Sequence, residues 1–292
     1  MYHTLNFGGD NMNIGFIGAG KVGFSLGKYF CNNDIKISGY CSHSLKSAKE
    51  AADFTNSKFY VNLNDLIKES DIIFITTPDS IISSVWDKID KSDIENKIFC
   101  HCSGSLSSKV FYNIEDYNAY SYSIHPLFAF SDKYKSHEFL KEAFITIEGS
   151  SERIEDIKKL IQTLGNDFKV ISDNDKARYH LSSTIVCNLV LGLIDEGINQ
   201  LKMCGFDDEE ARKALYPLVN NSINSIFKNG TINSLTGAVE RADEITLMKH
   251  LECLDNDDKE LYKLLSRKLI KIAEIKNRNR DYKAIKLMMG EE

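Results

Sequence analysis

Three titratable side chains stand where they could move a proton during a reaction: His125, Lys176 and His180. His125 follows the strand-like run at 119–124 and precedes Pro126. A histidine with a pKa near neutrality can pass a proton to or from an alcohol or an amine. A histidine before proline can also simply end a turn, and both interpretations of His125 stay open at this point.

A series of polar residues follows one side of a long apolar helical stretch. The spacing is three or four residues, which places them on a common face, with two more at its margin: Lys176, His180, Ser183 and Cys187, then Thr184 and Asn188. Polar groups in an apolar helix need partners, and a bound substrate could supply them. Alternatively, Lys176 and His180 are solvated near the helix start and Asn188 bonds to a neighbouring helix. Lys176 and His180 are therefore acid–base candidates, whereas Ser183 and Asn188 are candidates for binding substrate.

A glycine-rich motif opens the first long helical stretch. Residues 18–23 read G-x-G-x-x-G and directly follow the strand-like run at 13–17. In such a turn Gly18 permits the bend, Gly20 lets the backbone approach a pyrophosphate, and Gly23 lets the helix pack on the strand. The alternative is a glycine-rich turn in a fold that has lost its cofactor. We predict a dinucleotide site formed by Gly18, Ala19, Gly20, Lys21, Val22 and Gly23.

The residues after the second strand bear on which nicotinamide cofactor binds. In proteins that prefer NAD, an acidic residue about 20 positions beyond the glycines binds the ribose 2′-hydroxyl. No acid occurs from Ile35 to Lys49, and Ser42, His43 and Ser44 instead offer hydroxyl groups and an imidazole to a 2′-phosphate. We therefore expect NADP rather than NAD, the alternative being an ordinary polar loop with a solvated His43.

Two further segments follow predicted strands and so lie at the carboxyl edge of the sheet, where ligands bind in this architecture. Thr76-Thr77-Pro78 is one, although it is also a common way to begin a helix. Ser103-Gly104-Ser105 is the other, and its hydroxyls and backbone amides could bind a substrate carboxylate or the nicotinamide amide. The preceding Cys100-His101-Cys102 suggests zinc, but adjacent strand residues point to opposite faces, so we predict no metal.

The elements that would position these residues change in character along the chain. From 13 to 172, short β-branched runs alternate with helical stretches, which indicates a Rossmann-type doubly wound parallel sheet. Beyond 173 the patterns are long and helical, which indicates an all-α domain. We expect a disordered tail at 1–11, with Met12 as the natural start, a dinucleotide-binding domain at 12–172 and a helical domain at 173–292.

Composition limits the partners. The chain has 292 residues, with 36 Lys and Arg against 42 Asp and Glu, and the net charge of −6 argues against nucleic acid. Its longest apolar runs, such as 185–194, fall short of a membrane span. Without a secretory signal, the seven cysteines are expected to be reduced in the cytoplasm. The long apolar helix at about 175–204, with Gly205 as its cap, predicts a homodimer formed through the C-terminal helices.

Taken in order, the elements resemble the 6-phosphogluconate dehydrogenase-like superfamily, which includes pyrroline-5-carboxylate reductase, prephenate dehydrogenase and the β-hydroxyacid dehydrogenases. More closely, GFIGAGKVG, HCSGSLSS, HPLFAF, K-x-x-YH-x-x-S and LTG resemble Rossmann-like NADP oxidoreductases whose C-terminal domain has no known function. The resemblance implies an NADP-binding domain, a dimerising helical domain and an active site between them. It also implies that His125 contacts the reacting hydroxyl, as in prephenate dehydrogenases. Lys176 is similar to the lysine of β-hydroxyacid dehydrogenases, with His180 in the place of their asparagine.

These observations predict an NADP-dependent oxidoreductase that transfers hydride to or from a small polar, carboxylate-bearing substrate. His125, Lys176 and His180 are the proton-transfer candidates. The residues expected to position the substrate are Ser103, Ser105, Ser183 and Asn188, and the cofactor is expected to contact Thr76, Thr77, Pro78, Ser103 and Gly104 as well as the glycine-rich turn. The alternative from another class is a non-catalytic dimer that binds NADP as a sensor.

Overall fold

The computed structural model describes residues 6–7 and 10–291. Near the N-terminus, β1 (Asn6–Phe7) and β2 (Asp10–Asn11) form an antiparallel pair. For these four residues the structure has a strand pair where a disordered tail is expected from the sequence. The same prediction for 1–5 and 8–9 lies outside the described residues.

The chain divides into two compact units, one ending at Val190 and one beginning at Leu191. We call them the sheet unit and the helical unit. The predicted division after residue 172 falls earlier than this boundary, which lies inside a continuous helix. The first half of that helix therefore belongs to the sheet unit.

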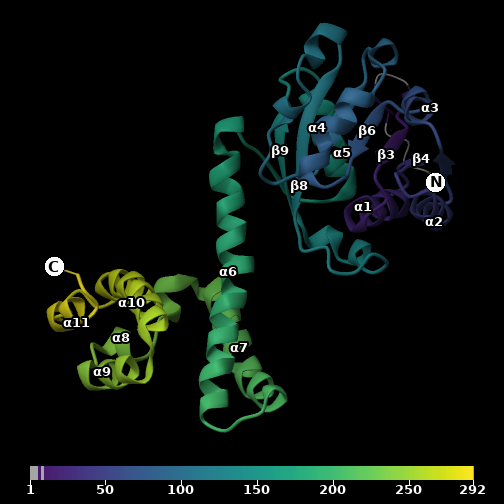
Figure 1. Cartoon of the computed structure of the whole chain (residues 1–292). Helices are drawn as coiled ribbons and strands as arrows, with labels where there is room; N and C mark the ends of the chain where they lie inside the picture. Colours follow the sequence, from purple (N-terminus) through teal and green to yellow (C-terminus); the bar gives the residue numbers. More distant parts are fainter. Residues whose placement is uncertain (1–5, 8–9, 292) are drawn as a thin grey trace. The chain divides into compact units, whose positions relative to one another are not determined.

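An eight-stranded sheet forms the centre of the sheet unit (Figure 1). Its strands, in the order in which they neighbour one another, are β10 (Phe168–Val170), β9 (Phe144–Gly149), β8 (Tyr120–Leu127), β7 (Ile98–His101), β6 (Ile72–Ile75), β3 (Ile14–Ile17), β4 (Ile37–Cys41) and β5 (Lys58–Tyr60). The six strands from β8 to β5 run parallel, which confirms the Rossmann-type α/β prediction.

The sheet departs from the parallel arrangement at one edge. β9 runs antiparallel to β8, and β10 runs parallel to β9. The connection at 128–143 contains only two short 3-10 turns, at Ser136–Glu138 and Leu140–Glu142. A parallel neighbour needs a crossover, usually a helix, whereas an antiparallel one does not.

Helices cover both faces of this sheet. They are α1 (Lys21–Asn32), α2 (Leu45–Thr55), α3 (Leu63–Lys68), α4 (Asp79–Lys88) and α5 (Ile154–Leu164). Alternate residues of β6 face opposite ways: Phe74 joins a core with residues of α1, α2 and α5, while Ile73 and Ile75 join another with residues of α3 and α4. Burial on both faces explains why the central strands are continuous apolar runs.

The helix that crosses the unit boundary is α6 (Lys176–Met203). The other helices of the helical unit are α7 (Asp208–Ser234), α8 (Ala238–Arg241), α9 (Glu244–Cys253), α10 (Asn256–Lys276) and α11 (Lys283–Met288). Gly205 has φ of +92°, and the Phe206 N–H donates to the Leu201 carbonyl, so the predicted glycine cap of α6 is confirmed. The small core of this unit includes Leu247, Ile270 and Ile285.

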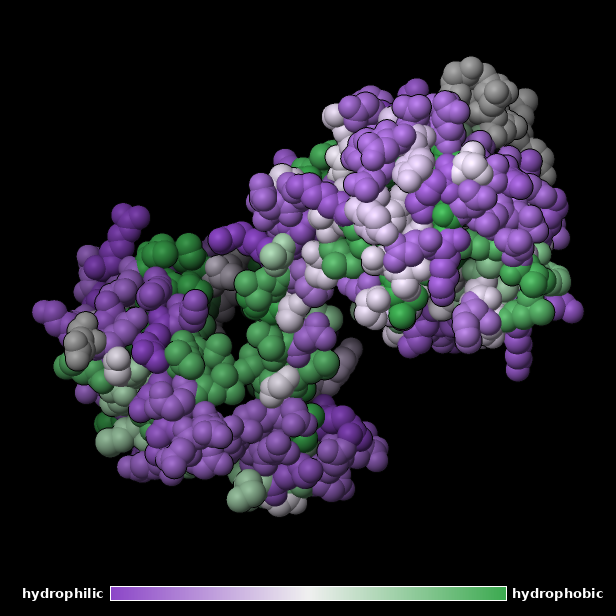
Figure 2. Space-filling view, turned by 45° about the horizontal axis from the view of Figure 1, so that its top comes forward, coloured by the Kyte–Doolittle hydropathy of each residue, from purple (hydrophilic) through white to green (hydrophobic). Residues whose placement is uncertain are grey.

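Many apolar side chains on α6 and α7 are exposed, among them Val186 (68%) and Phe227 (85%). Figure 2 shows hydrophobic residues gathered on the surface of this helical part of the chain. Within the described residues, 173–203 is long and apolar enough to cross a membrane by length and composition, and none of its most apolar window is buried. Ser, Thr and Gly interrupt the apolar residues of this helix, so its uninterrupted apolar runs are much shorter than the helix itself.

Candidate active site

The glycine-rich turn connects β3 with α1. Gly18 has φ of +107°, a region that favours glycine, and its N–H donates to the Cys41 carbonyl at 2.8 Å. A Cβ at Gly23 would lie 2.3 Å from Thr76 Oγ1, whereas a Cβ at Gly20 would meet no atom within 4 Å. Gly20 also begins α1 without a side-chain cap, so the first helix amides are available to an anion. This open cradle fits a dinucleotide pyrophosphate.

The other residues of the turn have different environments. The side chains of Ala19 and Val22 belong to the core that contains Phe74, where Ala19 is buried and Val22 is half-buried. Only the backbone groups of these two residues could therefore contact a cofactor. Lys21 is exposed. Of the six predicted contacts, Lys21 is therefore the one whose side-chain charge is free to approach a phosphate.

The loop after β6 lies directly against this turn. Thr76 Oγ1 donates to the Gly18 carbonyl at 3.0 Å, so this hydroxyl holds the turn in place. Thr77 Oγ1 is buried and has no partner among the described residues. Pro78 is the residue before α4, which agrees with the alternative that this sequence begins a helix. Thr77 is left as an orphan polar group at the carboxyl edge of the sheet.

The loop after β4 carries the residues predicted to contact a 2′-phosphate. Ser44 is the N-cap of α2, where its Oγ accepts the Ser47 N–H at 3.2 Å. Ser42 is half-buried and His43 is exposed. Because the hydroxyl of Ser44 already serves α2, Ser42 and His43 are the more available groups.

His125 is paired with a tyrosine from the start of α6. Its Nδ1 lies 2.6 Å from Tyr179 Oη. Burial raises the pKa of Tyr179, so its hydroxyl stays protonated and can donate to Nδ1. Burial, together with the Lys176 ammonium and then His180, lowers the pKa of His125 to about 4. The imidazole is therefore neutral at neutral pH, and when Tyr179 donates to Nδ1 the hydrogen of the ring lies on Nε2.

Gly104 lies between two imidazole rings. A Cβ on this residue would be 2.9 Å from His125 Nε2 and 2.8 Å from His180 Cδ2. Its N–H has no acceptor among the described residues. The glycine thus leaves room beside His125 Nε2 and places a backbone donor there.

Lys176 is buried, at 2% exposed, and holds the loop that contains Gly104. Its Nζ donates to the Ser103 carbonyl at 2.9 Å and to Ser123 Oγ at 2.6 Å, and Ser123 Oγ donates to the same carbonyl at 3.0 Å. Among the ion pairs of the described residues, none includes Lys176. Burial lowers its pKa to about 8, although the Glu148 carboxylate opposes this.

The serines of the same loop bond within the protein. Ser103 Oγ and Ser105 Oγ donate to Asp79 Oδ2, at 2.6 and 3.1 Å. His101 Nδ1 accepts the Ser103 N–H at 3.1 Å, and its Nε2 donates to the Ser107 carbonyl at 3.2 Å. Burial lowers the pKa of His101 to about 4, so this ring is a neutral support. Asp79 and His101 therefore fix the shape of the loop.

The other predicted site residues of α6 are His180, Ser183 and Asn188. His180 is exposed, and its carbonyl accepts the Ser183 hydroxyl at 2.8 Å. Asn188 is exposed as well. The His180 ring lies beside Gly104. Within the described residues, neither Ser183 nor Asn188 forms a hydrogen bond to the loop.

Sequence reasoning missed Asp79, Ser123 and Tyr179. Ser123 and His125 alternate along β8 and so face the same way, a pattern that can be read from the sequence. Tyr179 is three residues after Lys176, the spacing of neighbours on a helix. Asp79 is the first residue of the helix that follows β6, again at the carboxyl edge.

Two family models match separate parts of the chain. One, described as NADP oxidoreductase coenzyme F420-dependent, matches residues 13–103, which contain the glycine-rich turn and Ser103. The other is a domain of unknown function, DUF2520, and matches residues 143–269, which contain Lys176, Tyr179 and His180. A search among curated proteins finds no significant match. At a general level, the first match supports an oxidoreductase that uses a nicotinamide cofactor.

Solved structures with the same arrangement cover nearly the whole chain. Protein TM1727 from Thermotoga maritima is 25% identical, with a TM-score of 0.75 over 91% of this chain and 100% of that one. BF3122 from Bacteroides fragilis, provisionally described as an NADP oxidoreductase, is 22% identical, with a TM-score of 0.69 over 89% and 98%. Pyrroline carboxylate reductase from Plasmodium falciparum, solved with NADP bound, is 15% identical, with a TM-score of 0.60 over 92% and 98%. The last two likenesses establish the fold alone.

Proposed function

We propose that this chain is an NADP-dependent oxidoreductase that transfers hydride to or from a small polar substrate bearing a carboxylate, at a C=O/CH–OH or C=N/CH–NH centre. The observation that carries the proposal is the pairing of an open glycine cradle with a buried, neutral His125 whose Nε2 faces Gly104. Both lie at the ends of strands in one doubly wound sheet, the usual ligand side of this fold. The match to NADP oxidoreductases supports the cofactor class.

The cofactor would lie across the carboxyl edge of the sheet. The amides at the start of α1 would bind its pyrophosphate, and Ser42 and His43 would bind the 2′-phosphate that distinguishes NADP from NAD. Thr77 and the Ser103-Gly104 peptide lie where the nicotinamide end would need polar partners. The bound nicotinamide would supply or accept the hydride, which leaves geometry and one proton to the protein.

His125 is the residue best placed to handle that proton. Its neutral ring would pass the Nε2 proton to the substrate oxygen or nitrogen while Nδ1 takes the proton of the Tyr179 hydroxyl, so that the imidazole stays neutral. Before the transfer, the hydrogen bond from Tyr179 to Nδ1 selects this tautomer. His180, exposed beside Gly104, is the second candidate. Lys176 is the third, although its Nζ already bonds to the Ser103 carbonyl of the loop and to Ser123 Oγ of β8, which favours a positioning role.

The substrate carboxylate would be bound by neutral hydrogen-bond donors rather than by a positively charged side chain. The Gly104 N–H is available beside both imidazoles. Ser103 and Ser105 would act mainly through the backbone, because their hydroxyls are directed to Asp79. Contacts from Ser183 and Asn188 stay predictions.

We also propose that the exposed apolar side chains of α6 and α7 cover a second copy of the chain rather than a bilayer. Asp175 directly precedes α6, and the first turn of α6 carries Lys176 and Arg178. Lys176 is fixed inside the sheet unit by its bonds to the Ser103 carbonyl and to Ser123. Burying such side chains between subunits removes apolar area from water at about 25 cal/mol per Å². Sedimentation in detergent-free buffer should then show a dimer. The seven free cysteines suit a cytoplasmic protein.

The decisive experiment is single-turnover oxidation of bound NADPH with a panel of keto acids, imino acids and aldehydes. At least one substrate should be reduced, and His125→Asn should lower the rate about 10²- to 10⁴-fold while the cofactor still binds. A matched control is His250→Asn, because His250 also bonds through Nδ1 to a tyrosine, Tyr262, but lies in the helical unit. That control should retain the rate.

The outcomes separate the alternatives. Micromolar NADPH binding without turnover of any panel member would favour the non-catalytic sensor. Failure to bind either NAD or NADP would refute both the oxidoreductase and the sensor. Tighter binding of NAD than of NADP would refute the 2′-phosphate contacts, and full activity in His125→Asn would exclude His125 as the proton carrier.

A further inference from the structure

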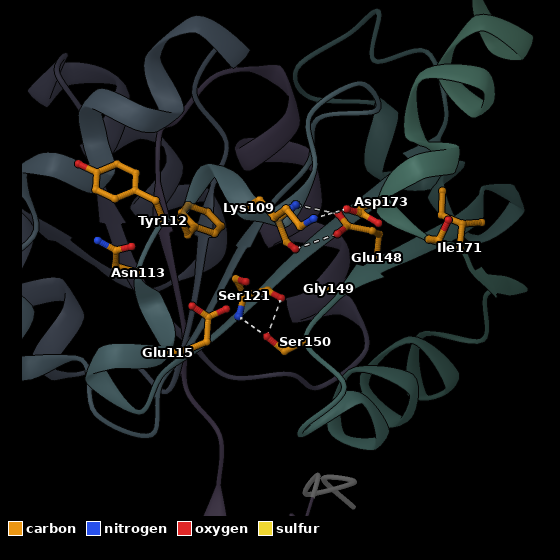
Figure 3. A pocket seen from close by; sticks show the side chains of 13 residues that line it. Lys109, Tyr112, Asn113, Glu115, Ser121, Glu148, Gly149, Ser150, Ile171 and Asp173 are labelled. Carbon is orange, nitrogen blue, oxygen red and sulfur yellow. Dashed lines mark hydrogen bonds and ion pairs between the residues drawn. The ribbon is translucent and has the colours of Figure 1, made fainter.

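A cavity of about 410 Å³ opens in the sheet unit away from His125, at the N-terminal end of β8 (Figure 3). Its walls come from the 3-10 turn at Ser108–Val110, from β8 and β9, and from the segment before α6. The volume is within the range of sites that hold small molecules. None of the residues assigned to the proposed oxidoreductase reaction lines it.

One hydroxyl that lines this cavity has no partner in the described part of the chain. Ser121 is only 4% exposed and lines the cavity, and its Oγ makes no hydrogen bond within the described residues. Its backbone is fully used: the N–H donates to Ser150 Oγ at 3.1 Å, and the carbonyl accepts the Ser150 N–H at 3.0 Å. Figure 3 shows Ser121 and Ser150 side by side on the cavity wall. The hydroxyl is therefore available to an occupant.

A buried carboxylate stands on the same wall. Glu148 is also 4% exposed, and its two oxygens accept the Ser108 N–H at 2.8 Å and the Ser108 hydroxyl at 2.9 Å. A carboxylate has about four acceptor positions, so capacity remains on both oxygens. Burying such a group is costly unless a donor or a cation completes its shell.

The charges around the cavity favour a cation. Lys109 and Asp173 form an ion pair at 2.5 Å and offset each other, and the buried Lys176 ammonium offsets part of the charge of Glu148. Glu148 and the lining Glu115 together still leave a net negative charge. Among the described residues, no three acidic, histidine or cysteine side chains converge as metal ligands. An organic cation that donates directed hydrogen bonds matches this arrangement better than a bare metal ion does.

We propose that this cavity is a second binding site, for a small organic ammonium compound that carries hydroxyl groups. The ammonium contacts Glu148, and a hydroxyl of the ligand bonds to Ser121. Ser121 shares one face of β8 with Ser123 and His125, because alternate strand residues face the same way. Ser123 in turn bonds to Lys176, so the site borders the polar face that supports the Gly104 loop.

The test uses two small probes that differ in one group, 2-amino-1,3-propanediol and glycerol, with the full chain observed by NMR. The amine should shift the amide signals of Ser121, Ser150 and Glu148 at millimolar concentration, and glycerol should bind at least about tenfold more weakly. Ser121→Ala and Glu148→Gln should each weaken amine binding about tenfold. Ser121→Ala removes a hydroxyl without a protein partner, so its fold should be preserved, and Glu148→Gln retains an oxygen that can accept from Ser108.

The control variant is Ser84→Ala, an exposed position on α4 that should leave binding unchanged. Equal affinity for the two probes would overturn the ammonium assignment. Unchanged amine affinity in Ser121→Ala and Glu148→Gln, or shifts confined to other residues, would overturn the site. Because the readout is binding without NADP, failure of the oxidoreductase proposal would not affect it.

Discussion

Replacing Lys176 by methionine tests how the candidate active site is held together. Burial lowers the lysine pKa from 10.5 to about 8. At 1.36 kcal/mol for each pKa unit, the charged ammonium costs the folded protein about 3 kcal/mol, and partial screening by solvent brings this to about 2 kcal/mol. Methionine removes that cost but also two hydrogen bonds, worth about 1 kcal/mol each. The Ser103 carbonyl keeps its bond from Ser123, so it is not orphaned.

The variant and the wild type should therefore have free energies of unfolding within about 1 kcal/mol of each other at pH 7. Their difference should change with pH. Below about pH 8 the lysine is charged in both the folded and the unfolded chain. Between about pH 8 and 10.5 the folded chain releases the proton first, so wild-type stability rises by about 2 kcal/mol relative to the variant.

Urea unfolding at several pH values, followed by tryptophan fluorescence, measures this difference. Trp86 is the only tryptophan and is packed against Phe99 and Phe111, so its signal reports on the sheet unit. The control is Lys169→Met, which removes an exposed lysine on β10 and should show no such pH dependence. A loss of about 3 to 5 kcal/mol at pH 7, as for breaking a buried ion pair, would refute the reasoning. A difference that stays constant up to pH 10.5 would refute it too.

Four glycine and tyrosine substitutions test the rest of the site. Gly23→Ala should lower the free energy of unfolding by about 2 kcal/mol in urea, because its Cβ would lie 2.3 Å from Thr76 Oγ1; unchanged stability would contradict this. Gly20→Ala should unfold like wild type but bind NADPH about tenfold more weakly by calorimetry, since the Cβ occupies the open cradle; equal affinity would argue against a pyrophosphate there. Gly104→Ala should lower kcat about 10²-fold by displacing the imidazoles beside it, and undiminished kcat would separate that residue from the reaction. Tyr179→Phe should lower kcat at least about tenfold with little change in KM, because the tautomer is no longer selected; a change in KM alone would indicate a binding role.

The sheet could be predicted from sequence except at its edge. Strand and helix periods alternate clearly up to residue 127, and burial of both faces makes the central strands apolar throughout. The run at 144–149 has the same alternation whether it pairs parallel or antiparallel, so its own pattern does not decide direction. The connection at 128–143 carries the information, because it lacks the helical period that a parallel crossover requires.

The two parts of the candidate site differ in how far they could be predicted. The glycine-rich turn is a local motif in which all the needed residues are adjacent, so sequence spacing was enough to find it. The His125–Tyr179 contact joins residues 54 positions apart, and Lys176 meets the Ser103 carbonyl across 73 positions. Such pairs depend on where α6 meets the sheet, and a single sequence does not contain that register.

The polar residues of α6 show why a shared helix face was an incomplete guide to the site. The spacing of Lys176, His180 and Ser183 places them in one row, and one of the two interpretations of that row has all three residues bordering the substrate. Each residue of a helix lies 1.5 Å farther along the axis than the one before it. Residues later in the row are therefore too far from a site at the first turn to contact it. Lys176 and His180 contact the Ser103-Gly104 loop, whereas the Ser183 hydroxyl turns back to the carbonyl one turn earlier. The first turns of α6 therefore carry the side chains that contact the site, and the later turns carry exposed apolar side chains. Replacing the exposed apolar residues of α6 beyond Ser183 by polar ones should consequently weaken dimerisation more than it slows the reaction. Sedimentation would measure the first effect and NADPH turnover the second.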